Sequence, residues 1–295
     1  MINSYSSVLG YGTRDKGVYQ SLLLFLLLLI GCGAEWTSVE VGKTSCSFDE
    51  FLPNVGRAPK MATGNNGQQL YILDDFSYVY SYKRDNLYEC AFNLENTYRF
   101  NGFPKDVLFA NNNFYVQDGA YLKTKDDNKQ CNAKDGFFAI SGNELAVGDK
   151  SGVEIWSISG SNCAKKGSIS SQSVLALAAT NSEYYVAEAG GFANEPLNLA
   201  VYSKNGEQIH LEPMSSIPGN EKNFCSADRI AANDYGVYLL DKKCRKIGVF
   251  DNQAFWRKTI NLDSLGIRNP SDIGAGEHSY IFIMLSNGME RVNVF

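Results

Sequence analysis

Five acidic residues recur at the same place in a repeated phrase of this sequence. Each ends a short apolar run and opens a turn; they are Asp74, Asp118, Asp149, Glu188 and Asp241, and a sixth copy of the phrase ends in Ser286. Carboxylates gathered in this way could hold a hard cation such as Ca²⁺ or meet a cationic ligand. An acid at the start of a turn also accepts hydrogen bonds from nearby backbone amides, and recurrence in every copy favours that local role.

Other chemistry-bearing patterns are few. His210 and His278 are the only histidines, they lie far apart in the sequence, and no C-x-x-C pair exists, so a zinc site is not expected. Phosphate-binding loops, nucleophile elbows and H-E-x-x-H motifs do not occur. The net charge of −5, with no clustered basic run, argues against a nucleic-acid partner.

The repeated phrase itself predicts the fold. Strand-sized apolar runs alternate with Asn-Gly, Asp-Gly and Ser-Gly turns, and no segment shows a helical period. The first strands of the copies begin near Lys60, Lys105, Phe137, Leu175, Asp228 and Ser271. These starts lie roughly 30 to 55 residues apart, as expected for four-stranded propeller blades. We therefore predict an all-β fold, a six-bladed β-propeller over residues 45–295.

The two ends of the chain are expected to complete one another. The last copy stops at its third strand, residues 291–295, and residues 45–53 resemble the fourth strand of the fifth copy. The N-terminal strand would then close the last blade and pair an otherwise exposed sheet edge.

Six cysteines follow the first 40 residues, and six allow 15 pairings. Their places in the blade register select one of these, in which neighbouring blades or neighbouring loops are joined. We predict disulfides between Cys46 and Cys90, between Cys131 and Cys163, and between Cys225 and Cys244.

The N-terminus has the pattern of an export signal. Arg14 and Lys16 precede the apolar run of residues 21–30, which is short for a membrane span. The tetrapeptide that ends in Cys32 resembles the bacterial lipobox, which implies a signal peptide over residues 1–31, a lipid (palmitate) on Cys32 and a tether over 32–44. An ordinary signal peptide or an uncleaved anchor are the alternatives. Gly33, in place of Asp, favours the outer membrane of a bacterial cell envelope.

The fifth repeat, residues 226–250, resembles the NHL-type propeller repeat, as do the blade starts 103–107 and 269–273. NHL-like propellers include binding scaffolds and enzymes, so the resemblance implies a fold and no reaction. In six-bladed calcium-dependent lactonases a Glu, Asn and Asp set holds the metal in the channel. Asp228 and Asp272 are the nearest candidates here, and we expect them, like Asp106, to be structural.

Two long loops interrupt the repeat, residues 189–198 and 213–224, and loops on a rigid scaffold commonly bind partners. The residues predicted to contact a partner are Phe192, Asn194, Glu195, Met214 and Phe224. The alternative is that their apolar members cover their own loops. The expected function is a non-catalytic, envelope-anchored scaffold without a cofactor that binds a protein, peptide or glycan. A Ca²⁺-dependent hydrolase or lactonase, or an outer-membrane assembly factor, is the alternative.

Overall fold

The computed structural model describes residues 41–49, 56, 58–160, 162–190, 197–215, 219–277 and 280–294. These residues form strands and one 3-10 turn, Asn65–Gly67. Across this part of the chain, no helix has the length and apolar character needed to cross a membrane.

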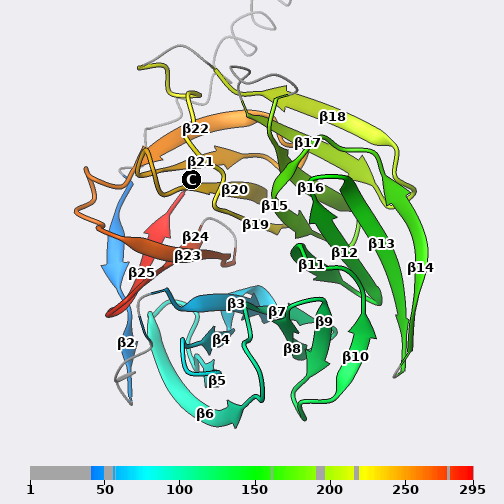
Figure 1. Ribbon diagram of the computed structural model, residues 1–295. Coiled ribbons are helices and arrows are strands. Elements are labelled where there is room, and N and C mark those ends of the chain that lie inside the picture. The colour runs from blue at the N-terminus through cyan, green and yellow to red at the C-terminus, as the bar shows by residue number, and fades with distance from the viewer. Residues whose placement is uncertain are drawn as a thin grey trace, which may run out of the picture. The chain divides into compact units, whose positions relative to one another are not determined.

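Six sheets surround a central channel, which makes the fold the predicted six-bladed propeller (Figure 1). Blade 1 contains β3 (Lys60–Gly64), β4 (Gln69–Leu73), β5 (Tyr78–Lys83) and β6 (Ala91–Arg99). Blade 2 contains β7 (Asp106–Ala110), β8 (Asn113–Asp118), β9 (Tyr121–Thr124) and β10 (Lys129–Asn132). Blade 3 contains β11 (Phe137–Ser141), β12 (Glu144–Asp149), β13 (Gly152–Ser159) and β14 (Asn162–Ile169).

Blade 4 contains β15 (Val174–Ala179), β16 (Glu183–Glu188), β17 (Asn198–Ser203) and β18 (Gln208–Pro213). Blade 5 contains β19 (Arg229–Asn233), β20 (Gly236–Asp241), β21 (Lys246–Phe250) and β22 (Trp256–Asn261). Blade 6 contains β23 (Pro270–Ala275), β24 (Tyr280–Leu285) and β25 (Gly288–Asn293). We call the four strand positions a to d from the channel outward; the b–c and d–a loops form one face, the loop face, and the a–b and c–d turns form the opposite turn face.

The N-terminal segment closes the ring, but two residues earlier than predicted. Strand β1 (Lys43–Ser45) pairs with β25 as the fourth strand of blade 6 and begins inside the predicted tether. The chain then crosses to blade 1, where β2 (Ser47–Phe48) pairs in parallel with β6. The predicted single strand over 45–53 is therefore two short strands in two blades. Both are short outer-rim strands with exposed side chains, which carry little periodic signal.

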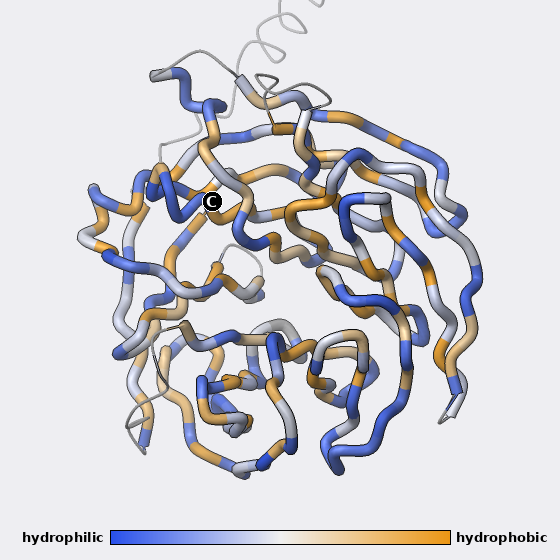
Figure 2. Tube along the Cα trace, viewed as in Figure 1, coloured by the Kyte–Doolittle hydropathy of each residue, from blue (hydrophilic) through white to orange (hydrophobic). Residues whose placement is uncertain are grey.

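The core lies between the blades. Inner strands are covered on both faces by neighbouring blades, so they are almost wholly apolar; every residue of β20 is buried. Outer strands face water, and β14 exposes most of its residues, including Lys165 and Lys166. Figure 2 shows this gradient, with apolar residues concentrated on the inner strands and polar ones toward the rim.

A buried arginine strengthens the junction between blades 6 and 1. The side chain of Arg84 is 1% exposed and lies 5.4 Å from the ring centre of Phe282. Its Nε donates to the carbonyl of Gly67 at 3.1 Å, and a terminal nitrogen lies 3.6 Å from Glu277. The guanidinium thus stays hydrogen-bonded in an apolar setting, as a buried charge requires.

All three predicted disulfides are present. Cys46, between β1 and β2, is bonded to Cys90. Cys131 and Cys163 join the outer strands of blades 2 and 3, and Cys225 and Cys244 join two loops on the loop face.

Replacing Cys46 and Cys90 together by Ser is expected to lower the free energy of unfolding by about 2–4 kcal/mol. The bridge closes a segment of 44 residues across the ring junction, whereas Cys225–Cys244 closes only 19. The Cys225→Ser/Cys244→Ser protein is therefore the control, with a smaller loss. Urea unfolding without reductant measures both; an equal or larger loss in the control would contradict this order.

Candidate functional site

The repeated acids hold the loops of their own blades. Asp74 accepts the backbone N–H groups of Phe76 and Tyr78 at 2.9 and 2.7 Å, and Asp149 accepts that of Ser151 at 2.7 Å. For Asp74, Asp149 and Asp241 the expected local role in making the b–c turn is confirmed.

These acids also fasten the loop that leads into their blade. Asp118 accepts the N–H of Phe103 at 3.2 Å, and Glu188 accepts that of Gln172 at 3.2 Å. Asp118 and Glu188 thus hold the preceding d–a loop, and Asp241 holds both that loop and its own b–c turn.

One cluster in the described part of the chain has the residue types of a metal site, namely Cys225, Asp241 and Cys244. Both sulfurs belong to a disulfide. The Asp241 carboxylate accepts the backbone N–H groups of Cys225 and Cys244 at 2.6 and 2.8 Å. Without thiolates, and with its carboxylate engaged, this cluster is a structural joint.

The channel is lined by strand a of all six blades, around a cavity of about 110 Å³. At its loop-face end, each blade contributes one residue near the start of strand a. In blade order these residues are Lys60, Asp106, Phe137, Ala176, Arg229 and Asp272. Two cations, two carboxylates and two apolar residues thus share one layer, which we call the channel ring.

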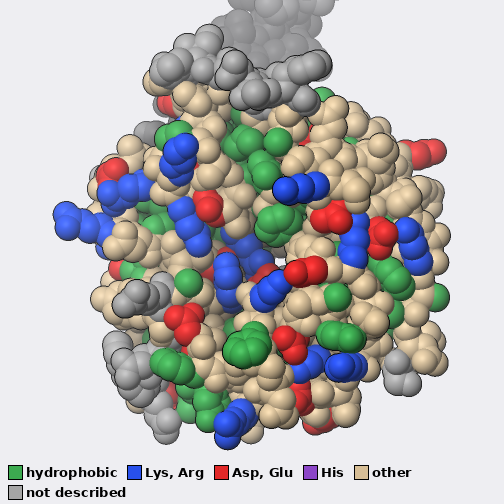
Figure 3. Space-filling view, viewed as in Figure 1, with side chains coloured by type: hydrophobic (Ala, Val, Ile, Leu, Met, Phe, Trp, Pro, Cys, Tyr) green, Lys and Arg blue, Asp and Glu red, His purple; other side chains and the backbone are tan. Residues whose placement is uncertain are grey.

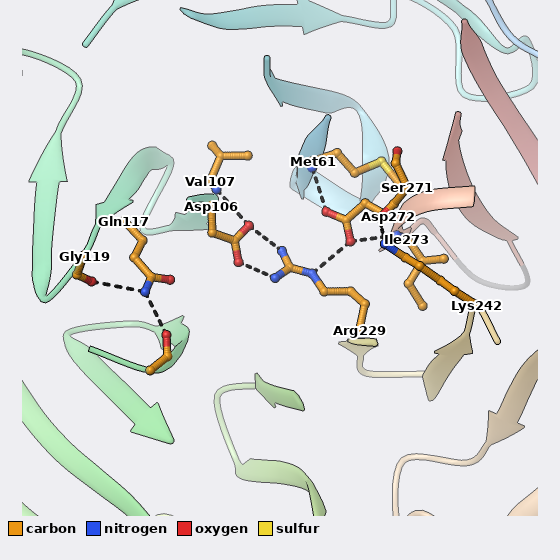
Figure 4. Close-up of polar contacts among 11 residues, drawn as sticks. Met61, Asp106, Val107, Gln117, Gly119, Arg229, Lys242, Ser271, Asp272 and Ile273 are labelled. Carbon is orange, nitrogen blue, oxygen red and sulfur yellow. Dashed lines mark hydrogen bonds and ion pairs between the residues drawn. The ribbon is translucent and has the colours of Figure 1, made fainter. Parts of the chain in front are cut away.

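Arg229 connects three blades within the channel ring (Figure 4). Its two terminal nitrogens bind both oxygens of Asp106 in blade 2, one of them at 2.8 Å. Its Nε lies 3.0 Å from Asp272 in blade 6. We call these three residues the arginine bridge.

The carboxylates of the bridge are also tied to the backbone. Asp272 accepts the N–H groups of Met61 in blade 1 and of Ile273, each at 2.9 Å, and Asp106 accepts that of Val107 at 2.9 Å. Bidentate and backbone contacts of this kind compensate the cost of burying these charges.

Electrostatics in the bridge follow from burial and charge pairing. Burial alone would lower the pKa of Arg229, but Asp106 and Asp272 outweigh it and raise that pKa, so the guanidinium stays charged. Burial raises the pKa of Asp106, and Arg229 opposes this effect. The bridge has no free general base, because each carboxylate is engaged by a cation and by amides.

Three exposed aromatic side chains stand on the loop face beside the channel. Phe76, Phe103 and Phe137, which we call the aromatic set, are 64%, 88% and 42% exposed. Hydrogen bonds link their loops in series: Ser77 donates to the carbonyl of Gly102, and the Gln117 amide donates to that of Gly136. The three rings therefore lie on contiguous, mutually fixed loops of blades 1 to 3.

Of the five predicted contact residues in the two long loops, two are buried and three lie outside the described residues. Met214 and Phe224 are 4% and 6% exposed and pack with the core between blades 4 and 5, which favours the alternative that they cover their own loops. Phe192, Asn194 and Glu195 lie outside the described residues, as do Cys32 and His278. His210 lies on β18 against Phe255, with their ring centres 4.2 Å apart.

Calcium candidates are also placed by the structure. Asp272 is fully buried in the arginine bridge, whereas Asp228 is exposed and accepts a hydrogen bond from the N–H of Lys242 at 2.8 Å. Sequence reasoning missed that Arg229 pairs with Asp272 in the place where a metal cation would bind. Aligning the six starts of strand a would have revealed it as a cation at a position shared with two carboxylates.

Replacing Arg229 by Met is expected to lower the free energy of unfolding by about 3–5 kcal/mol, because two buried carboxylates lose their cation. Lys105→Met, which removes an exposed pair with Asp135, is the control and should cost about 0–1 kcal/mol.

Burial raises the pKa of Asp106, and the variant lacks the cation that opposes this. The folded variant then binds protons more tightly than the unfolded chain, so its deficit should shrink as the pH falls from about 7 to 5. Urea unfolding at both pH values measures this; a loss no larger than that of the control would contradict it.

Comparison with known proteins supports the fold. No family model matches the sequence, and no curated protein matches it. Among solved structures, a catalytically inactive virginiamycin B lyase from Staphylococcus aureus with quinupristin is 13% identical over 83% of each chain, with a TM-score of 0.51. Its selenomethionine form is 9% identical over 87% of this chain and 99% of that one, with a TM-score of 0.53. A luciferin-regenerating enzyme is 11% identical over 83% and 94%, with a TM-score of 0.52. At these identities the likeness is one of fold.

Proposed function

We propose that this protein is a non-catalytic binding scaffold on the bacterial cell envelope. It is anchored in the outer membrane by a lipid on Cys32 and presents its loop face to a protein, peptide or glycan. The observation that carries the proposal is the aromatic set, three exposed rings on loops that hydrogen bonds hold in place.

Exposed aromatic rings on rigid loops are well suited to binding. An aromatic side chain buries a large area at a small cost in conformational entropy, and such residues are common among the dominant contacts of interfaces. Phe103 is 88% exposed although its backbone N–H is held by Asp118. The ring is thus displayed on a fixed backbone, which reduces the entropy that binding must offset.

The channel offers little to a metal-dependent reaction in the described conformation. A hard cation would need carboxylate oxygens, and those of the channel ring already contact the Arg229 guanidinium. A positive charge therefore already occupies the place where the lactonase resemblance would put Ca²⁺.

A second candidate is a Ca²⁺-dependent hydrolase or lactonase. Solved structures of similar fold are named as a lyase and a luciferin-regenerating enzyme, and Asp106 and Asp272 do converge in the channel. This candidate requires Arg229 to give up a carboxylate to the metal. A third, an outer-membrane assembly factor, would use the same loop face with an outer-membrane protein as the partner.

Changing Phe76 and Phe103 together to Ser is expected to weaken partner binding on the order of tenfold or more, because exposed aromatic anchors are removed. Crosslinking and pulldown from solubilised envelopes, compared with the unchanged protein, measure this. Tyr88→Ser is the control, since Tyr88 is 90% exposed and lies in a c–d turn on the opposite face.

The same partners should be retained by the Tyr88→Ser protein and lost by the Phe76→Ser/Phe103→Ser protein. Equal retention by both would contradict the proposed binding face. Recovery of outer-membrane proteins in particular would identify the assembly role.

Calcium and EDTA are each expected to leave the Tm unchanged, because Arg229 occupies the carboxylates of the channel. A bound ligand at 100 times its Kd would stabilise the fold by about 2.7 kcal/mol, which a thermal melt detects readily. A calcium-dependent rise in Tm that Asp272→Asn abolishes would favour the hydrolase instead.

A further inference from the structure

Two lysines stand at the loop-face mouth of the channel, next to the arginine bridge. Lys60 begins β3 in blade 1, and Lys242 follows β20 in the b–c turn of blade 5. The Lys242 ammonium reaches across to blade 6, where it donates to the carbonyl of Ser271 at 2.5 Å (Figure 4). Both side chains are partly buried. Charged side chains, many of them basic, gather around the centre of the ring in Figure 3.

Neither lysine forms an ion pair with a carboxylate in the described part of the chain. Asp106 and Asp272, the two buried acids of the channel ring, pair with Arg229. A third acid, Asp228, accepts hydrogen bonds from the Ser226 hydroxyl and from the backbone N–H of Lys242. No ion pair within 4.0 Å joins Lys60 or Lys242 to any described acid, whereas Lys105, Lys134 and Arg229 each have one.

Charged side chains from blades 1, 5 and 6 act on Lys242. Burial is the main cause that lowers its pKa, followed by the charge of Lys60, with a further contribution from Arg229. Asp272 and Asp228 oppose this by raising it. Both lysines flank the same two residues of blade 6. Asp272 binds the N–H of Met61, next to Lys60, and the carbonyl of Ser271 binds Lys242. A negative charge near the two ammonium groups would offset the repulsion between them.

We propose that the channel mouth binds an anionic group, a carboxylate or a phosphate, between the ammonium groups of Lys60 and Lys242. This inference rests on the proposed function, because it names the chemistry of the group that the partner presents to the loop face. An ammonium has three N–H donors, and Lys242 uses one of them on Ser271. The others remain for charge-assisted hydrogen bonds, which are the strong ones.

The rest of the mouth fits the same ligand. The arginine bridge lies beside the lysines, and its guanidinium is already paired with both Asp106 and Asp272. Phe137 belongs to the channel ring on the side away from Lys242 and is 42% exposed. An acidic group on an apolar or aromatic stem would therefore find a cationic side and an apolar side in one mouth.

The test is an NMR titration of the full propeller with sodium phosphate and, separately, with sodium acetate, at ionic strength held constant with sodium chloride. The two arms distinguish a phosphate from a carboxylate. We expect saturable shifts at the amides around Lys60 and Lys242 with at least one of the two anions. The Lys60→Gln/Lys242→Gln protein should bind that anion on the order of tenfold more weakly.

Two variants make the result specific. Lys243 is exposed and follows Lys242 in the sequence. The Lys243→Gln protein loses the same charge and should bind the anion as the unchanged protein does. Lys242→Arg keeps the charge and should retain binding. Non-saturable shifts with both anions, or equal affinity in the double variant and the unchanged protein, would overturn the anion site.

The two proposals fail in different ways. If phosphate or acetate binds as expected but Phe76→Ser/Phe103→Ser retains every partner, the binding face is wrong and the anion site stands. If the aromatic variant loses its partners while neither anion saturates, the anion site is wrong and the face stands.

Discussion

Ring closure is the constraint on which this structure depends. Each blade is stable only when its neighbours cover both of its faces, so one incomplete blade would expose the core along a whole side. The chain meets this at one junction with several different interactions. β1 completes blade 6, β2 extends blade 1, a disulfide sits between them, and Arg84 ties the same two blades from within. Several different interactions are thus found at the junction that the N-terminal segment closes.

The arginine bridge applies the same logic at the centre. At the channel, the carboxylates of Asp106 and Asp272 accept backbone N–H groups at the starts of the inner strands. Arg229 links blade 5 to blades 2 and 6, and Asp272 passes the connection to blade 1. One cation therefore restrains four of the six blades. Because Arg229 pairs with the carboxylates of the channel, those carboxylates are not free to bind a metal or a ligand. We therefore expect binding at the exposed loops.

Much of the fold follows from the sequence because its signal is local and repeated. The b strands, the starts of the a strands and the disulfides could all be placed, since one register fixed them together. Asp74 and Asp149 were interpreted correctly for the same reason, because their partners lie two to four residues away. Asp118 and Glu188 instead bind d–a loops 15 and 16 residues earlier. Arg229 and Asp106 are 123 residues apart, and no local pattern announces such a pair. Met214 and Phe224 lie in loops without periodicity, so their burial could not be read from the sequence.

The channel ring has a consequence for how any ligand would be oriented. A propeller built from identical repeats would offer six equivalent poses around its axis, and a ligand would be spread among them. Here the six equivalent positions hold Lys60, Asp106, Phe137, Ala176, Arg229 and Asp272, and no rotation of the ring reproduces that order. The scaffold is nearly symmetric in its backbone and fully asymmetric in its side chains. A ligand in the channel mouth would therefore have one preferred orientation about the propeller axis, instead of six equivalent ones.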